Sequence, residues 1–283
     1  MVKDMLRILT DTGSDITYHA AKGLGMEVVE LDVKFDEMPY DYRNDLDFRV
    51  FYENLGKSKK LPSTSQVNPS QYLEIYNDAK EKGDEVLVIT LSSKISGTFS
   101  SANMAKEECG YDGITVVDSH LAISGQRSLA ELAVKQRDEG KSRGEIESVL
   151  ISLRDRMKFV ACLDTLTYLK KGGRVPPAMA LIGNAIKIKP LVCMEDGAVI
   201  PLDKVRGFKA GVNIIWNKLE KDGFEDSVIP VYFGHTNNEE AGRSFMEETV
   251  SKFGIKNYKF VPVGGVIGTH AGPNAVVITY LAK

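Results

Sequence analysis

Membrane and secretion signals are missing from this sequence of 283 residues. No apolar stretch approaches the roughly 20 residues that a membrane-spanning helix needs. The N-terminal stretch MVKDMLRILTDTGSD runs straight into a strand pattern and does not resemble a signal peptide. Cysteine is scarce, and Cys109, Cys162 and Cys193 lie far apart, so neither a disulfide framework nor a zinc site is indicated. We therefore expect a cytoplasmic protein with buried, reduced thiols.

Signatures of common ligands are equally few. The absence of GxGxxG argues against a dinucleotide, and no GxxxxGK[ST] P-loop occurs, although a sugar-phosphate or nucleotide enzyme stays open. His19, His120 and His235 fall at unrelated spacings without an HExxH motif, so neither a metal nor another cofactor is expected. The net charge of -3 comes from interspersed acids and bases without a basic stripe, so nucleic acid is not an expected partner.

The hydrophobic pattern of the chain predicts an α/β fold with two lobes. In the first half, short β-branched runs at 5–11, 26–35, 85–91 and 114–119 alternate with amphipathic stretches, as in βαβ units around a parallel sheet. The second half has a different sequence pattern, with a hairpin that turns at Asp196-Gly197, and this pattern predicts a mixed sheet. We place the boundary near residue 157, giving lobes 1–157 and 158–283 with a ligand cleft between them.

Two segments are rich in hydroxyl groups and poor in charge. The first, LPSTSQVNPS (61–70), places Thr64 and Ser65 in a charge-free loop before a helix that Asn68 and Pro69 would start. Neutral donors suit a carboxylate that enters a water-poor pocket, and Gln66 is expected to hold the loop in shape. An ordinary hydroxyl-rich turn between helices explains the same residues equally well.

The second segment, LSSKISGTFSSA (91–102), follows an apolar strand. Ligands bind at the carboxyl ends of parallel strands, where the N-termini of helices present free amides, so Ser96 and Gly97 could hold an anion. Glycine would also permit close approach of a ligand to the backbone. The alternative is that Ser96 only caps the next helix.

Two further segments carry polar side chains suited to a site. The turn KKGGR ends at Arg174, whose planar guanidinium can bind a carboxylate through two bonds, although such a turn also ends many helices. The stretch VGGVIGTHAGPNA (263–275) is too glycine-rich for a strand and places His270 in a tight loop. His270 with Ser96 raises the alternative of a serine esterase or hydrolase, but no GxSxG motif is present.

Taken together, these motifs form an ordered set that resembles the DegV family of fatty-acid-binding proteins. The resemblance covers about residues 5–282 and rests on TDTGSD (10–15), PSTSQ (62–66), LSSKISGTFSSA (91–102), VVDS (116–119), YLKKGGR (168–174), KPLV with a glycine-bearing hairpin (189–200) and GTHAGP (268–273). Two departures are visible. The family's DSTSD start reads DTGSD here, and Pro176 replaces a serine often found after GGR, which puts a hydroxyl contact just beyond Arg174 in doubt.

The resemblance implies a two-lobed bacterial lipid carrier without turnover of its own. Such a protein buries one long-chain fatty acid, palmitate- or oleate-like, and presents its carboxylate to a fatty acid kinase for phospholipid synthesis. Carried over by motif, the hydroxyls of Thr64 and Ser96 would hold the carboxylate, while Arg174 and His270 would complete the polar network or face the partner. Ser65 and Gly97 are supporting neighbours. Transient contact with a membrane is compatible with lipid transport.

Overall fold

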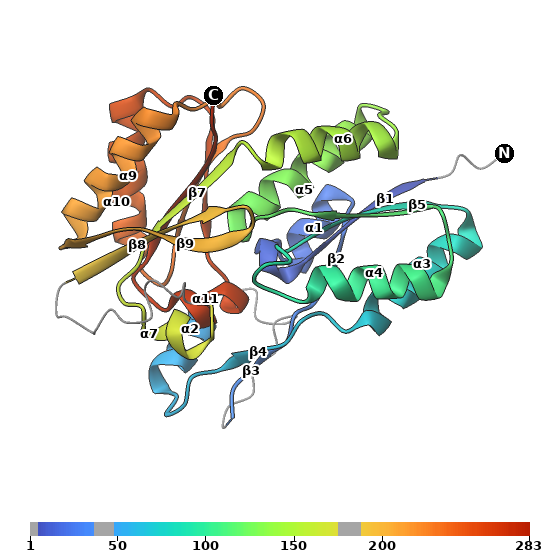
Figure 1. Cartoon of the computed structure of the whole chain (residues 1–283), viewed down its shortest axis with the longest axis horizontal. Coiled ribbons are helices and arrows are strands. Elements are labelled where there is room, and N and C mark those ends of the chain that lie inside the picture. Colours follow the sequence, from blue (N-terminus) through green and yellow to red (C-terminus); the bar gives the residue numbers. More distant parts are fainter. Residues whose placement is uncertain (1–4, 37–47, 175–187) are drawn as a thin grey trace. The chain divides into compact units, whose positions relative to one another are not determined.

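The computed structural model describes residues 5–36, 48–174 and 188–283. The chain forms two units, and Figure 1 shows their elements coloured along the sequence. The first unit comprises Met1–Asp32 and Ser65–Asp155, and the second comprises Val33–Thr64 and Arg156–Lys283. The segment 33–64 therefore belongs to the second unit, although it lies between two parts of the first unit in the sequence. We call this segment the excursion; the sequence pattern did not predict it. The boundary near residue 157 stays a prediction.

The first unit is built on a parallel sheet of four strands in the order β2-β1-β5-β6. Its strands are β1 (Leu6–Asp11), β2 (Glu27–Val29), β5 (Glu85–Thr90) and β6 (Ile114–Asp118). Strand β5, with the sequence EVLVIT, is buried along nearly its whole length. Such a continuous apolar strand is typical of a parallel sheet that is covered on both faces.

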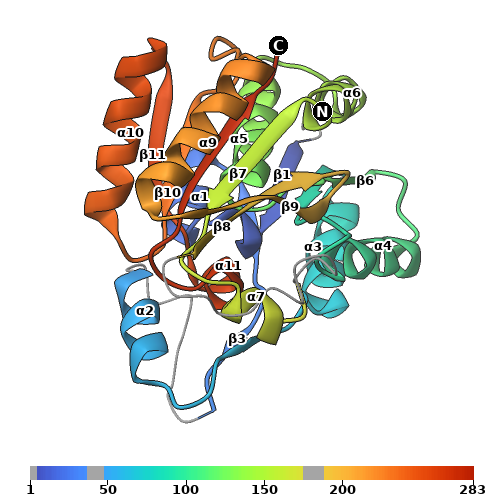
Figure 2. The same ribbon diagram turned by 60° about the vertical axis from the view of Figure 1, so that its left-hand side comes forward.

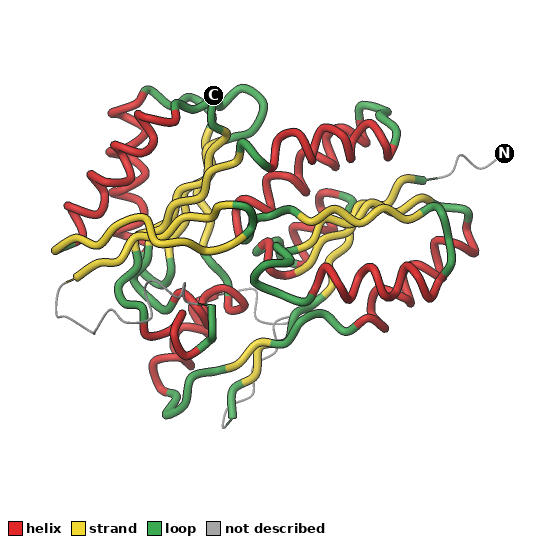
Figure 3. Tube along the Cα trace, viewed as in Figure 1, coloured by secondary structure: helices red, strands yellow, loops and turns green. Residues whose placement is uncertain are grey.

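Helices cover both faces of this sheet. Figure 3 shows helices on both sides of the strands. The bounds are α1 (Tyr18–Leu24), α3 (Pro69–Lys82), α4 (Thr98–Cys109), α5 (Ile123–Asp138) and α6 (Arg143–Arg154), with the short 3-10 helix η1 (Thr12–Ser14) after β1. Helix α3 packs with α4, and α5 packs with α6. The arrangement is a doubly wound α/β layer.

Local sequence signals set the ends of these helices. Asn68 Oδ1 accepts from Ser70 N at 3.1 Å and α3 begins at Pro69, as the Asn-Pro pair predicts. Gly83 ends α3 in the left-handed conformation with φ 74°, a region that glycine enters without steric cost. These local rules hold because neither end depends on distant contacts.

The second unit contains a mixed sheet of six strands in the order β11-β10-β12-β7-β8-β9. Its strands are β7 (Met157–Cys162), β8 (Ile188–Glu195), β9 (Ala198–Arg206), β10 (Val231–His235), β11 (Tyr258–Pro262) and β12 (Val276–Leu281). Among the described strands of this sheet, the neighbours β10 and β11 pair in parallel, and the other neighbouring pairs are antiparallel. The predicted hairpin is confirmed, because Asp196 (φ 48°) and Gly197 (φ 80°) form the turn between β8 and β9.

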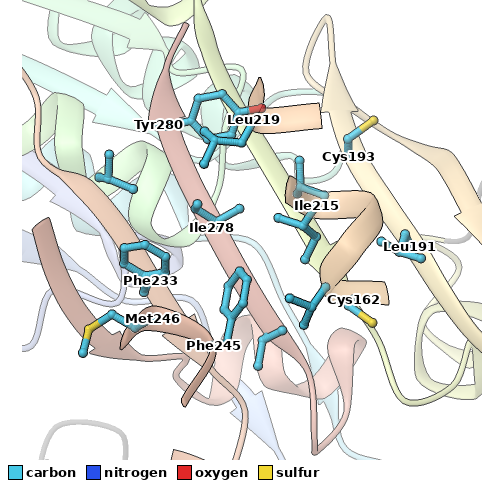
Figure 4. Packing of buried hydrophobic residues seen from close by; sticks show 14 of the residues in the cluster. Cys162, Leu191, Cys193, Ile215, Leu219, Phe233, Phe245, Met246, Ile278 and Tyr280 are labelled. Atoms are coloured by element: carbon cyan, nitrogen blue, oxygen red, sulfur yellow. The ribbon is translucent and has the colours of Figure 1, made fainter. Parts of the chain in front are cut away.

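Helices α9 (Phe208–Asp222) and α10 (Glu239–Phe253) pack against this sheet and share one apolar core with it. Figure 4 shows Ile215 and Leu219 of α9 beside Ile278 of β12, with Phe245 of α10 next to Phe233. The Phe233 and Phe245 rings meet edge to face at 5.6 Å. All three cysteines of the chain are buried and free.

The excursion 33–64 adds a small layer to the second unit. Its described residues form β3 (Val33–Lys34), α2 (Phe48–Lys57) and β4 (Ser63–Thr64), and β3 and β4 form a two-stranded antiparallel sheet. Helix α11 (Gly265–Ala271) contacts both α2 and α7 (Thr167–Lys171), as Figure 2 allows the reader to follow. The excursion thus brings β4 to the end of α11 that carries His270.

The structure confirms an α/β fold with a parallel-sheet lobe and a mixed-sheet lobe, but one predicted strand is wrong. The run 26–35 does not form a single strand, because β2 ends at Val29 and β3 begins at Val33 in another sheet. Between them, Glu30 N donates to Gln71 Oε1 at 3.2 Å and Leu31 N to Thr12 Oγ1 at 2.9 Å. These side-chain bonds replace the strand ladder and turn the chain out of the first sheet.

The sequence PAMALIGNAIK (177–187), which has the pattern of a helix, lies outside the described residues, as does Pro176. Across the described ranges, no helix is both long enough and apolar enough to span a membrane.

Candidate functional site

The loop 91–97, which we call the Ser96 loop, follows β5 at the carboxyl edge of the first sheet. Two carboxylates from the neighbouring strands hold its backbone. Asp11, the last residue of β1, accepts from Leu91 N at 2.8 Å, and Asp118, the last residue of β6, accepts from Ser93 N at 3.2 Å. The loop is therefore fixed from both sides before it reaches Ser96.

Ser96 stands at the start of α4 and is half-buried. Its Oγ accepts from Thr98 N at 3.3 Å and lies 2.9 Å from Thr98 Oγ1. The alternative that Ser96 caps the helix is wrong, because Gly97 is the N-cap of α4 and makes no side-chain capping bond; the Ser96 contact is a local turn onto the first residue of the helix. Thr98 Oγ1 also accepts from Val67 N at 3.4 Å, so its own proton can go to Ser96. In that arrangement the Ser96 hydroxyl keeps a proton that it can donate to a ligand.

Gln66 occupies the space beside Gly97. A Cβ at position 97 would lie 1.8 Å from Gln66 Oε1, so the close approach that this glycine permits is that of Gln66. The Gln66 amide donates to Ser101 Oγ at 2.8 Å, and Ser65 N donates to Asp32 O at 3.1 Å. Both contacts hold the hydroxyl-rich segment 61–70 in shape.

Thr64 and His270 form a second polar cluster, within the second unit. Thr64 lies on β4 and His270 on α11, and the distance between Thr64 Oγ1 and His270 Nε2 is 2.8 Å. The turn after α7 closes the other side of the ring, because a Cβ at Gly172 would lie 2.2 Å from His270 Nδ1. We call Thr64, His270, Gly172 and Arg174 the His270 cluster.

The His270 imidazole is neutral at pH 7. Burial lowers its pKa from 6.5 to about 4, and the nearby charge of Arg174 acts in the same direction. Its Nδ1 is buried and has no hydrogen-bond partner among the described residues. Arg174 itself is exposed, and its Nη1 donates to Gly172 O at 2.7 Å. The cluster therefore combines a neutral interior with a cation at its surface.

The prediction of a tight loop around His270 is wrong, because residues 265–271 form the helix α11. Glycine is a poor helix former, so packing supplies the reason. A Cβ at Gly268 would lie 2.7 Å from Tyr52 Oη and 2.8 Å from Phe51 Cε1, so only glycine allows α11 to sit this close to α2. Tyr52 Oη also donates to Val263 O at 2.8 Å, just before α11 begins.

The geometry gives no support to a serine hydrolase. In such enzymes a carboxylate holds the second ring nitrogen of the histidine. His270 Nδ1 has no such partner in the part of the chain that the structure describes. No group of three or more His, Cys, Asp or Glu within the described ranges is placed to hold a metal ion.

The sequence analysis did not single out Asp11 as an individual residue. This carboxyl is fully buried, and burial raises its pKa from 3.8 to about 6, while hydrogen bonds from Leu91 and Gly13 N and from Gln126 partly offset the shift. An acid that directly follows an apolar strand at the ligand-binding edge of a parallel sheet was the available signal.

Known proteins are similar to this chain over most of its length. The DegV family model, described as an uncharacterised protein of the DegV family, matches residues 5–283. A DegV domain-containing protein of Caldanaerobacter subterraneus is 32% identical, with 99% of this chain and 100% of the relative covered. A protein of Thermotoga maritima named fatty acid-binding protein is 31% identical, with 96% of each chain covered.

A solved structure carries the same fold. The DegV family protein of Thermus thermophilus, whose structure is described as showing fatty acid binding, aligns with a TM-score of 0.88 at 27% identity. The alignment covers 99% of this chain and 100% of that one. The match of the family model over residues 5–283, together with these relatives, shows that the chain belongs to the DegV family.

Proposed function

We propose that this protein binds one long-chain fatty acid, palmitate- or oleate-like, and carries it without chemical turnover. The hydroxyls of Thr64 and Ser96 hold the carboxylate. The observation that carries the proposal is the half-buried Thr64 hydroxyl, 2.8 Å from a histidine that burial keeps neutral. Relatives named for fatty acid binding support the choice of ligand.

The tail and the head group have different energetic tasks. Burying a methylene contributes about 0.8 kcal/mol, so a tail of about 14 methylenes contributes about 11 kcal/mol before ordering costs. An ionised carboxylate in apolar surroundings is unfavourable unless donors meet it. Neutral hydroxyls meet that need without adding a fixed buried charge, so a carrier built this way can still release its ligand.

Arg174 is the residue that we assign to a partner. It is exposed beside the buried part of the His270 cluster, and Lys171 at the end of α7 is also exposed. A fatty acid kinase with ATP would transfer the γ-phosphoryl group to a carboxylate oxygen, giving acyl phosphate and ADP. The guanidinium suits either the kinase surface or the new phosphate group.

The identity of the ligand is tested by extracting the purified protein with organic solvent and analysing the extract by mass spectrometry. We expect a single class of long-chain fatty acid, and delipidated protein should take up added palmitate or oleate. Absence of fatty acid in the extract, together with no uptake of either acid, would overturn the proposal.

The assigned hydroxyl of the first unit is tested by Ser96→Ala. We expect about a tenfold loss of palmitate affinity, because one hydrogen bond to a charged group is removed. Ser100→Ala is the matched control, since it removes an exposed hydroxyl from α4, the helix that follows Ser96. If both variants bind palmitate as tightly as the parent protein, Ser96 does not hold the carboxylate.

The assignment of Arg174 is tested in an assay with a bacterial fatty acid kinase and ATP. Arg174→Ala should reduce the rate of acyl phosphate formation while leaving palmitate binding nearly unchanged. Arg206→Ala, which removes another exposed arginine of the second unit, is the control. Equal rates for the parent and both variants would show that Arg174 does not contribute to the surface that meets the kinase.

A further inference from the structure

We infer that Tyr168 is a positioning residue that holds the turn bearing Arg174 in place by packing against Gly272. The turn comprises residues 172–174 and follows α7, whereas Gly272 follows α11, and both helices belong to the second unit. The inference deepens the proposed function, because it rests on the assignment of Arg174 to the surface that meets the kinase. Its structural part concerns the protein alone.

Backbone hydrogen bonds tie this turn to α7. Arg174 N donates to Leu169 O at 3.0 Å, and Gly172 N donates to Tyr168 O at 2.9 Å. Gly173 has φ 70°, the left-handed conformation in which many helices end. The position of the Arg174 backbone is therefore set by the position of α7.

Helix α7 needs contacts with other elements to stay in place. It has five residues, whereas isolated helices shorter than about 12 residues are marginal in water. Leu169 is buried and gives the helix one anchor. A second anchor is α11, which α7 contacts and beside which it lies in Figure 2. The position of Arg174 thus depends on how α7 packs against α11.

The two helices meet through two aromatic rings and two glycines. Each helix contributes one ring and ends at one glycine, namely Tyr168 and Gly172 for α7, and His270 and Gly272 for α11. A Cβ at Gly272 would lie 2.1 Å from Tyr168 Cδ2, and a Cβ at Gly172 would lie 2.2 Å from His270 Nδ1. Each ring therefore packs on the glycine that ends the other helix.

The ring of Tyr168, rather than its hydroxyl, makes the contact with α11. The atoms nearest to a Cβ at Gly272 are the ring atoms Cδ2, Cε2 and Cγ of Tyr168. Gly272 also has φ 69°, so a side chain there would be strained as well as in collision with the ring. Tyr168→Phe should therefore preserve the packing, whereas Tyr168→Ala should leave the space beside Gly272 empty.

Hydrogen exchange of the delipidated full-length protein, followed by mass spectrometry, measures how firmly the turn is held. We expect the amides of residues 172–174 to exchange at least about fivefold faster in Tyr168→Ala than in the parent, and at the parent's rate in Tyr168→Phe. Exchange in α10 should be the same in all three proteins. Unchanged exchange at 172–174 in Tyr168→Ala, or a matching rise in α10, would overturn the inference. Neither fatty acid nor kinase is present, so this result does not depend on the proposed function.

A double-mutant cycle tests whether Tyr168 acts through Arg174. Palmitate-loaded protein is the varied substrate of a bacterial fatty acid kinase with ATP, and kcat/KM for acyl phosphate formation is measured. We expect Tyr168→Ala to lower kcat/KM about fivefold in the parent background, but less than about twofold in the Arg174→Ala background. Tyr168→Phe should retain the parent value. An equal loss in both backgrounds would show that Tyr168 acts independently of Arg174 and would overturn the inference.

Gly272→Ala tests the same contact from α11. We expect it to lower kcat/KM to the same extent as Tyr168→Ala. Gly254→Ala is the matched control, because Gly254 also ends a helix of the second unit with a positive φ of 66°, yet a Cβ there meets nothing within 4 Å. If the two glycine variants behave alike, the collision with Tyr168 has no consequence and the inference fails. If the parent itself supports no acyl phosphate formation, the proposed kinase partner is wrong, and the hydrogen exchange result alone decides the inference.

Discussion

In each unit an ionisable side chain lies beside a hydroxyl-rich segment: Asp11, fully buried, in the first unit, and His270, partly buried, in the second. The two units treat these groups differently. Asp11 in the first unit accepts from Leu91 N at 2.8 Å and from Gly13 N at 2.9 Å, so backbone donors compensate its charge. His270 in the second unit has one ring nitrogen bonded to Thr64, and the other lacks a partner among the described residues.

Burial disfavours the charged form in both places, raising the pKa of Asp11 to about 6 and lowering that of His270 to about 4. The carboxylate remains mostly ionised at pH 7 because the amides support it, and its hydrogen bonds hold a loop in place. The histidine is neutral and its Nε2 lies 2.8 Å from the hydroxyl of Thr64. Asp11 thus supports a loop through its charge, whereas His270 contributes a neutral ring to a polar cluster.

The largest expected effect is on stability, from Asp11→Ala. The substitution leaves Leu91 N and Gly13 N buried without their acceptor, and each orphaned donor costs about 1–3 kcal/mol. We expect the free energy of unfolding in urea to fall by about 3 kcal/mol. His270→Gln should change it by less than about 1 kcal/mol. If both variants lose the same free energy of unfolding, Asp11 and His270 do not differ in their contribution to stability.

The next effect is the pH dependence of stability. The unfolded chain binds a proton at His270 near pH 6.5, whereas the folded chain does so only near pH 4. The contribution of His270 to the free energy of unfolding is therefore lost as the pH falls between these values. Asp11 acts oppositely, because its folded pKa of about 6 exceeds 3.8, and it adds stability as the pH falls through that window.

Urea unfolding at several pH values separates these two groups. Relative to the parent, His270→Gln should gain about 2 kcal/mol in the free energy of unfolding between pH 6.5 and pH 4. Asp11→Asn should show the reverse difference over the same range. Parallel stability curves for His270→Gln and the parent would mean that His270 has an ordinary pKa in the folded protein.

The smallest effect concerns the glycines of the second unit. Gly56→Ala should raise the free energy of unfolding by about 0.5–1 kcal/mol, because alanine is the better helix former and a Cβ there meets nothing within 4 Å. Gly268→Ala should instead lower the free energy, since its Cβ would lie 2.7 Å from Tyr52 Oη. Thermal unfolding of both variants tests this contrast, and a stabilised Gly268→Ala would show that α11 has room to move.

Local signals were sufficient to predict several elements from the sequence. The Asn68-Pro69 start of α3 and the Asp196-Gly197 turn depend only on the conformational preferences of those residues. The apolar run of β5 predicted a buried parallel strand for the same reason. The two-lobed α/β architecture followed from such patterns.

Distant contacts explain what the sequence analysis could not predict. The run 26–35 has a strand pattern throughout, yet Thr12 and Gln71 bind its middle amides and divide it. The glycine-rich α11 is a helix because it packs against α2. The pairing of Thr64 with His270 joins residues 206 positions apart, and no local pattern encodes their distance.

The central claim is that the Thr64 hydroxyl donates to the carboxylate of a bound fatty acid. Calorimetric titration of delipidated protein with palmitate tests it most directly, using Thr64→Val, Thr64→Ser and, as a control, Thr115→Val at a half-buried threonine of β6. We predict that Thr64→Val loses at least about tenfold in affinity, while Thr64→Ser and Thr115→Val bind nearly like the parent. A Thr64→Val protein that binds palmitate as tightly as the parent would contradict the claim.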